Sequence, residues 1–265
     1  MTEKQRGLVR AAGSISAVTA LSRITGYLRD SLQAVILGAA NSSDAFVIAY
    51  RIPNMLRRLV GEGALTSAFV PTFARYMKAD DRDAMWRFAG SVLYALTLIL
   101  AGLVTLGVLF SPLLVKILAW GFAVSPEKID LTVTLNRLMF PYIFFISLAA
   151  LASGILNAFD VFALPAFTPV LLNLAIIGCA LLMRRWFDDP AYAFAIGVLI
   201  GGALQIAVQI PALLRHGLML RPPRPFDRAG LREVGRLILP RVFGAGITQI
   251  NLVVDSNFAT SLRAG

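Results

Sequence analysis

Eight ionisable side chains occur in two stretches of the sequence that are otherwise apolar enough to form membrane-spanning helices. They are Arg23, Arg29, Asp30, Asp44, Arg51, Arg57, Arg58 and Glu62. Ionisable residues inside a spanning helix are costly, so they normally face a water-filled cavity or a partner. Arginine binds phosphate in bidentate fashion and stays charged at any relevant pH. This group of arginines and acids therefore predicts a cavity that binds an anionic ligand.

The spacing of these residues places several of them on shared helix faces. Successive helical residues turn by about 100°, so a step of seven residues returns close to the starting direction. Arg23 and Asp30 are one such step apart in the first expected helix. Four residues at steps of 7, 7 and 4 form a stripe along the second: Asp44, Arg51, Arg58 and Glu62. We expect the acids to hold the arginine side chains and to exchange partners during a conformational change.

Two of the arginines, Arg29 and Arg57, lie off these faces if both helices are straight. Pro53 removes a backbone hydrogen bond and can kink the second helix, which would turn Arg57 toward the same cavity. The alternative interpretation is internal salt bridging that only ties the helices together, with arginines near helix ends reaching to the membrane surface. The eight charges exceed what anchoring requires, which favours the cavity.

The elements that position these residues follow from the composition. Of the 265 residues, 57% are hydrophobic and only 15% are charged, and the mean hydropathy is +0.73. Soluble domains have about 25% charged residues to cover their surface, so the composition indicates an all-α polytopic membrane protein. The net charge of +10 then fits basic loops beside anionic lipid better than a nucleic-acid partner.

The apolar stretches predict about seven membrane-spanning helices, since one span needs about 20 mostly apolar residues. Two expected helices contain the charged residues described above: Ser14–Leu37 and Asp44–Tyr76. Four contain no charged residue: Phe88–Val115, Leu138–Phe159, Ala163–Met183 and Ala191–Leu214. A last one, Leu237–Val254, contains only Arg241.

Basic residues in alternate loops predict that the N-terminus is cytoplasmic. The pair Arg184 and Arg185 is the one exception to this alternation. Residues 221–236 form an expected amphipathic helix, with Leu231 and Val234 on one face and arginines on another, that lies at the cytoplasmic interface. The sequence thus divides into a six-helix lobe over residues 1–220, a linker over 221–236, and the first helix of a second lobe over 237–265.

The other groups capable of chemistry predict neither catalysis nor a cofactor. Asp80, Asp81 and Asp83 lie among basic residues, which favours a solvated loop over a Mg²⁺ site for an enzyme acting on polyprenyl phosphates. His216 is the one histidine, so no histidine-based metal site is expected. The sequence contains no Gly-x-x-x-x-Gly-Lys-Ser/Thr phosphate loop, so ATP is not the expected energy source.

Several blocks of the sequence resemble the MurJ/MviN family of lipid II flippases. The first runs SRITGYLRD over Ser22–Asp30, then GAA from Gly38 and DAF from Asp44, and RIPNMLRRLVGEGALTSAFVP over Arg51–Pro71. A second block begins GILNAF at Gly154 and continues LPAFTPVLLN to Asn173. Leu239 and Pro240 open the last expected helix in the same way.

The resemblance implies a transporter in the superfamily of multidrug, oligosaccharidyl-lipid and polysaccharide exporters. Its members move the undecaprenyl-pyrophosphate-linked peptidoglycan precursor across the bacterial inner membrane, through a cationic cavity between two six-helix lobes. The family positions important for function match Arg23, Arg29, Asp44 and Arg57, and Glu62 matches a gating position. We therefore expect Arg23, Arg29, Arg51, Arg57 and Arg58 to bind pyrophosphate, and Asp30, Asp44 and Glu62 to support or gate the site.

The chain resembles only the first lobe of that family plus one helix. One lobe provides half a cavity and no opposite wall for alternating access, so we expect it not to flip lipid by itself without a second-lobe chain. Two alternatives stay open: an exporter of another lipid-linked saccharide in the same superfamily, and a non-transporting membrane fragment or partner subunit.

Overall fold

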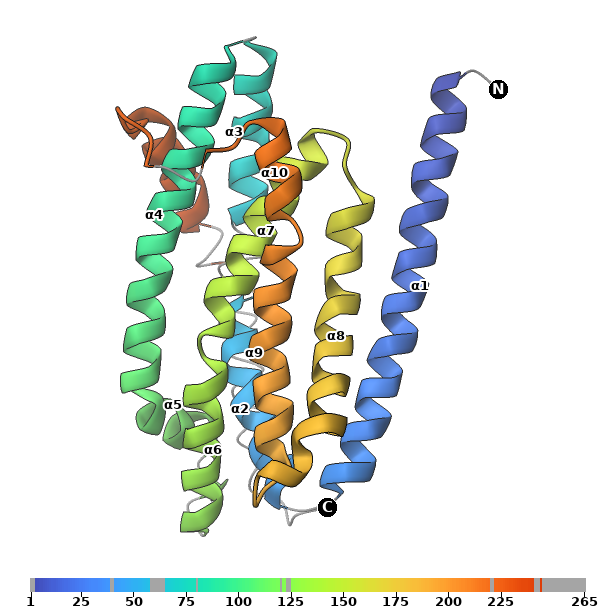
Figure 1. Cartoon of the computed structure of the whole chain (residues 1–265). Coiled ribbons are helices and arrows are strands. Elements are labelled where there is room, and N and C mark those ends of the chain that lie inside the picture. Colours follow the sequence, from blue (N-terminus) through green and yellow to red (C-terminus); the bar gives the residue numbers. More distant parts are fainter. Residues whose placement is uncertain are drawn as a thin grey trace.

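The computed structural model describes residues 3–38, 41–57, 65–79, 81–119, 121–122, 125–219, 222–240 and 244, and these residues contain helices and no strand. Because apolar stretches with few breakers run through most of the chain, helices follow one another with short connections (Figure 1). In chain order they are α1 (Glu3–Leu37), α2 (Asn41–Arg57), α3 (Thr66–Lys78), α4 (Arg82–Leu109), α5 (Ser111–Leu118), α6 (Pro126–Met139), α7 (Tyr142–Ala158), α8 (Ala163–Met183), the 3₁₀ turn η3 (Arg184–Trp186), α9 (Ala191–Ala207) and α10 (Ile210–His216). A further helix covers residues 228–240.

The four uncharged stretches are confirmed as helices long and apolar enough to cross a membrane. The spans run over Arg82–Leu109, Pro126–Ala158, Ala163–Trp186 and Ala191–His216. Two boundaries differ from the sequence prediction. The expected helix that ended at Val115 stops at Leu109, because Pro112 lacks a backbone donor and is placed in the first turn of a new helix, α5. The expected helix that began at Leu138 is part of a longer span that begins at Pro126, because α6 precedes α7 in the same pass.

The two charged stretches also form helices, but the second is not described as one helix. The expected Ser14–Leu37 lies within α1. The expected Asp44–Tyr76 is covered by α2 and α3, which lie on either side of residues 58–64. Arg58 and Glu62 belong to that segment and lie outside the described residues, as does nearly all of the expected last helix, Leu237–Val254.

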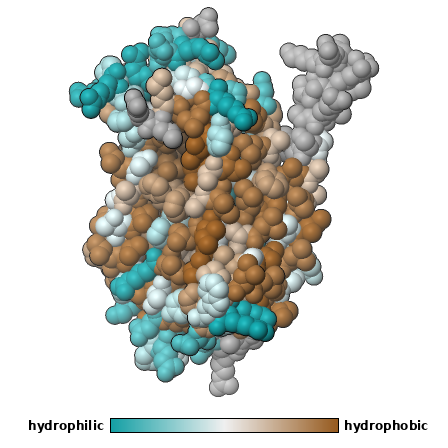
Figure 2. Space-filling model, viewed as in Figure 1, coloured by the Kyte–Doolittle hydropathy of each residue, from teal (hydrophilic) through white to brown (hydrophobic). Residues whose placement is uncertain are grey.

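Successive passes alternate in direction, so the connections gather at two ends of the lobe (Figure 1). One end holds the start of α1, the turn between α3 and α4, and the end of α10; the other holds the connections from α1 to α2 and from α8 to α9. The space-filling view shows a broad apolar belt between polar ends (Figure 2). Large apolar side chains such as Leu98, Ile99 and Leu182 are exposed in the described structure, as expected of residues that face lipid.

Close contact between α8 and α9 depends on two glycines four residues apart. A Cβ on Gly197 would lie 2.6 Å from the Cα of Ile176, and a Cβ on Gly201 would lie 2.7 Å from Leu172 Cδ1. Small residues at this spacing let two spanning helices approach at backbone distance. The α8–α9 pair is thereby fixed as one wall of the lobe, with α1 packed against the other side of α8 (Figure 1).

The helix over residues 228–240 packs against α3 and α4. Val234 is buried, whereas Arg228, Arg232 and Arg236 are exposed. Two acids fix the segment: Glu233 accepts a hydrogen bond from Arg75 and Asp227 accepts one from Tyr76 at 2.6 Å. The backbone N–H of Asp227 also donates to Ser91 Oγ at 2.9 Å. These polar contacts attach the linker to the end of the lobe where α3 meets α4.

Candidate functional site

A cavity of about 480 Å³ opens between α1, α2, α7, α8 and α9. Two of the arginines singled out in the sequence, Arg29 and Arg57, line it together. The remaining polar lining comes from neutral side chains: Tyr50, Tyr142, Ser153, Asn157, Thr168, Asn173 and Gln205. The cavity therefore has two fixed positive charges and no acid among its described lining residues.

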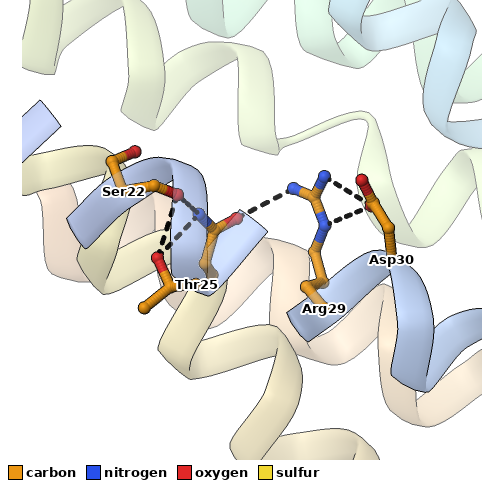
Figure 3. A network of polar contacts seen from close by, with 5 residues as sticks. Ser22, Thr25, Arg29 and Asp30 are labelled. Carbon is orange, nitrogen blue, oxygen red and sulfur yellow. Dashed lines mark hydrogen bonds and ion pairs between the residues drawn. The ribbon is translucent and has the colours of Figure 1, made fainter. Parts of the chain in front are cut away.

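Arg29 is held in place by contacts on both sides of its guanidinium (Figure 3). Its Nε and Nη2 donate to Asp30 Oδ1 at 3.0 and 2.7 Å, and its Nη1 donates to Asn173 Oδ1 at 2.9 Å. Asn173 is oriented in turn, because its Nδ2 donates to Ser22 O and Thr25 Oγ1 at 3.2 Å each. The Arg29 side chain is 23% exposed and that of Asp30 64%. The arginine is thus positioned by a buried amide, while its acid partner stays accessible to water.

A second cavity of about 250 Å³ adjoins the first, since Arg29 and Tyr50 line both. Arg51, Asn54 and Asp30 also line this second cavity. Three arginines from two helices therefore line two adjoining hollows. Separated guanidinium groups of this kind suit a ligand with more than one anionic oxygen, such as a pyrophosphate.

Arg57 faces the main cavity by virtue of its position on α2. Tyr50 and Arg57 are one seven-residue step apart and both line that cavity. Arg57 Nε donates to Asn54 Oδ1 at 2.8 Å, one turn earlier in the same helix. The sequence interpretation considered charges alone and so followed the stripe through Arg51. The Tyr50–Arg57 face was missed because tyrosine was not counted as part of it.

Asp44 lies on neither described cavity. Its Oδ2 accepts a hydrogen bond from Lys128 Nζ at 2.6 Å. The Lys128 side chain is only 9% exposed, compared with 39% for Asp44, and its Nζ lies 4.1 Å from the centre of the Phe122 ring. Lys128 belongs to α6. In this structure the carboxylate of Asp44 therefore neutralises a buried lysine rather than one of the arginines.

Arg23 is exposed on α1 and lines neither cavity. Its seven-residue partner Asp30 is also exposed, but contacts Arg29 instead. Arg58 and Glu62 lie outside the described residues. Of the eight charged residues, the structure thus gathers Arg29, Asp30, Arg51 and Arg57 around the two hollows.

Three neutral residues at the cavity were missed by the sequence analysis: Asn173, Gln205 and Tyr142. Asn173 and Gln205 are isolated amides in otherwise apolar spans, a pattern that indicates hydrogen bonding between helices and could have marked them. Gln205 is buried, and its Oε1 has no hydrogen-bond partner among the described residues. Within those residues, no three His, Cys, Asp or Glu side chains are placed to hold a metal ion.

Comparisons with a family model and with curated proteins agree with each other. A family model described as "Lipid II flippase MurJ" matches residues 33–265. The lipid II flippase MurJ of Burkholderia cenocepacia is 39% identical over 262 residues, which are 97% of this chain and 51% of that protein. A probable lipid II flippase MurJ of Vibrio cholerae is 35% identical over 269 residues, covering 97% and 50%. The chain spans about half the length of the curated relatives it matches.

Solved structures show the same likeness. A lipid II flippase MurJ in an inward closed conformation superposes with a TM-score of 0.76 at 30% identity, over 94% of this chain and 51% of that one. A transporter of the MOP superfamily from Pyrococcus furiosus, described as having a binding pocket of reverse polarity, gives a TM-score of 0.69 at 15% identity, over 91% of this chain and 54% of that one. The second match concerns the fold alone.

Proposed function

The chain belongs to the lipid II flippase MurJ family, and from that membership we propose that it is the N-terminal lobe of a flippase for the undecaprenyl-pyrophosphate-linked peptidoglycan precursor. The observation that carries the proposal is the placement of Arg29, Arg51 and Arg57 around two adjoining hollows. A pyrophosphate group leaving water needs compensating charge, and guanidinium groups supply it in bidentate geometry.

The hydrogen bonds around Arg29 suggest how a phosphate group would bind there. In the described state Asp30 accepts two hydrogen bonds from Arg29, so the arginine is neutralised without ligand. An incoming phosphate oxygen takes over those donors, and Asp30, which is largely exposed, turns to water. Asn173 keeps Nη1 in position throughout, because its amide is itself held by α1. Binding then costs little reorganisation of the arginine.

Transport by alternating access needs a second wall that faces this cavity. We propose that the wall is the part of the family's fold that corresponds to the other half of the curated relatives, and that this lobe does not flip lipid alone. The same proposal places the end of the lobe with the α3–α4 turn in the cytoplasm. Arg75, Lys78, Arg82 and Arg87 gather near that turn, in line with the excess of basic residues in cytoplasmic loops.

Complementation of a flippase-depleted bacterium tests the proposal. The chain is expressed alone, and also together with the second half of the Burkholderia cenocepacia relative. We expect growth only with both halves, and loss of growth when the lobe carries Arg29→Ala and Arg57→Ala together. The matched control is Arg184→Ala with Arg185→Ala, which removes two charges at the end of α8, away from the cavity lining.

Membrane levels of each variant are measured in parallel, so that loss of growth is separated from loss of protein. Growth supported by the Arg29→Ala and Arg57→Ala lobe at normal levels would contradict the assignment of the pyrophosphate site. Growth with the single lobe alone would contradict the need for the second wall.

A further inference from the structure

Two hollows lie along α4: one is enclosed by α4, α7 and α10, and the other by the start of α4 together with residues 217, 219 and 222–224 (Figure 1). Neither shares a residue with the arginine cavity, and α7 lines that cavity and the first hollow with different residues. The first hollow has a volume of about 270 Å³ and an almost wholly apolar lining. Its walls include Leu93, Thr97, Leu151, Ile155, Ile210 and Leu213.

The second hollow has a volume of about 380 Å³ and lies at the start of α4. It is polar and carries two arginines, Arg87 from α4 and Arg224 from the linker, together with Asp83 and Trp86. No ion pair joins Arg87 or Arg224 to an acid among the described residues. Two arginines and one aspartate leave a net charge of about +1 in this hollow, by simple charge counting at neutral pH.

The two hollows follow one another along α4, and we treat them as one groove with an apolar and a charged end. Along α4, Arg87 and Gly90 line the charged end and the next turn, at Leu93 and Tyr94, lines the apolar end. On the opposite side, Leu218 lines the apolar end, while its neighbours Gly217 and Met219 line the charged one.

We propose that this groove binds an anionic glycerophospholipid, with an acyl chain in the apolar hollow and the phosphate between Arg87 and Arg224. The charge fits, because one phosphodiester carries a single negative charge and guanidinium groups bind it in bidentate geometry. The setting fits as well, since Tyr94 lies in the apolar hollow one turn after Gly90 of the charged one, and tyrosine rings favour the membrane interface.

The bound lipid would join α4 to the linker. Arg224 belongs to the segment that leads into the helix over residues 228–240. That segment already contacts α4, because Pro223 lies against Gly90 and the Phe226 ring lies 6.5 Å from the Tyr94 ring. A phosphate shared by Arg87 and Arg224 adds a third contact, so lipid binding strengthens the attachment of the linker to the lobe.

Native mass spectrometry of the purified chain, titrated with phosphatidylglycerol or phosphatidylethanolamine, tests the proposal. We expect one tightly retained phosphatidylglycerol and weaker retention of phosphatidylethanolamine. Arg87→Gln with Arg224→Gln should weaken phosphatidylglycerol binding about tenfold, the scale of one charge-assisted contact. Thr97→Phe, which fills the apolar hollow without changing any charge, should weaken the binding of both lipids.

The matched control is Arg82→Gln with Arg228→Gln, which removes the same charge from exposed residues near the groove that do not line it. This control should retain phosphatidylglycerol like the unmodified chain. Equal loss in the control would show general surface attraction and overturn the site. Equal binding of the two lipids to the unmodified chain would overturn it too, as would displacement of phosphatidylglycerol by equimolar undecaprenyl phosphate, which would assign the groove to polyprenyl lipid instead.

Discussion

Helix α8 packs mainly against α1 and α9, and the two contacts differ in their physical nature. Toward α9, two glycines bring the backbones together, and no space is left for one added carbon at Gly197 or Gly201. Toward α1, the contact around Arg29 is polar: Asn173 bonds the arginine and two groups of α1. The first interface is filled, whereas the second borders an open cavity of about 480 Å³.

The two faces of α8 therefore differ in how easily their contacts can rearrange. Dispersion contacts at backbone distance cannot be rearranged without loss, so the α8–α9 pair acts as a rigid wall. Hydrogen bonds beside a wet cavity exchange partners at low cost, because water or ligand replaces what is lost. We infer that α1 can shift relative to α8 at lower cost than α9 can.

The largest expected effect on stability comes from closing the space between α8 and α9. Gly197→Ala places a Cβ 2.6 Å from the backbone of Ile176, which cannot move aside as a flexible side chain would. Overpacking of this kind costs about 1–3 kcal/mol, although alanine by itself favours a helix. Gly178→Ala on α8 is the control, because a Cβ there meets nothing within 4 Å.

The stability of both variants is measured as the thermal unfolding midpoint of the purified protein in detergent. We expect the midpoint to fall for Gly197→Ala and to stay level or rise for Gly178→Ala. A fall of equal size in both would mean that helix propensity or detergent, rather than the contact with α9, determines the result.

A smaller loss is expected at the ion pair between Asp44 and Lys128. Asp44→Asn leaves the buried Lys128 ammonium without its carboxylate, at a cost of about 1–3 kcal/mol. The lower part of that range applies because water reaches the partly exposed Asp44. Asp44→Asn combined with Lys128→Met should regain most of the stability, as removal of both charges usually does.

The exposed Asp130 of α6 offers a control, since Asp130→Asn changes the same charge without a buried partner. The thermal midpoints of the unmodified chain, Asp44→Asn, Lys128→Met and the double variant form a double-mutant cycle. The cycle measures the coupling energy between Asp44 and Lys128. If Asp44→Asn abolished complementation while its midpoint stayed unchanged, Asp44 would act on transport directly, and its pairing with Lys128 would not be its main role.

The sequence predicted those parts of the fold and site that depend on local pattern. Uncharged apolar stretches identified the four spans, and charge in apolar surroundings identified Arg29, Arg51 and Arg57. Both inferences rest on the high cost of placing polar groups in hydrocarbon, which acts at every position separately. The resemblance then connected the pattern with a family, which the comparisons confirm.

Pairings between distant residues could not be predicted in this way. Asp44 and Lys128 are 84 positions apart, and Arg29 and Asn173 are 144 apart. Periodicity within one helix states which residues share a face, but not which neighbour that face meets. The seven-residue stripe from Asp44 therefore joined residues whose partners prove to be different: Asp44 contacts α6, whereas Arg51 faces the second cavity.

The smallest expected change in stability, and the sharpest test of the polar interface, comes from Asn173→Leu. The substitution removes the acceptor for Arg29 Nη1, while Arg29 keeps both of its bonds to Asp30. Thr25 keeps its bond to Leu21 O at 2.9 Å, so the loss of stability should be about 1 kcal/mol. The affinity of the purified chain for undecaprenyl pyrophosphate should fall several-fold, because Arg29 is no longer held toward the cavity.

Thr25→Val is the matched control, since it removes the other end of the same network and leaves the bond between Asn173 and Arg29 intact. We expect it to weaken binding less than Asn173→Leu does. In the Arg29→Ala background, Asn173→Leu should have no further effect, because its influence on the ligand passes through that arginine. An additional loss of affinity in that background would mean that the amide of Asn173 contacts the ligand itself, and the α1–α8 interface would then be part of the binding surface rather than its support.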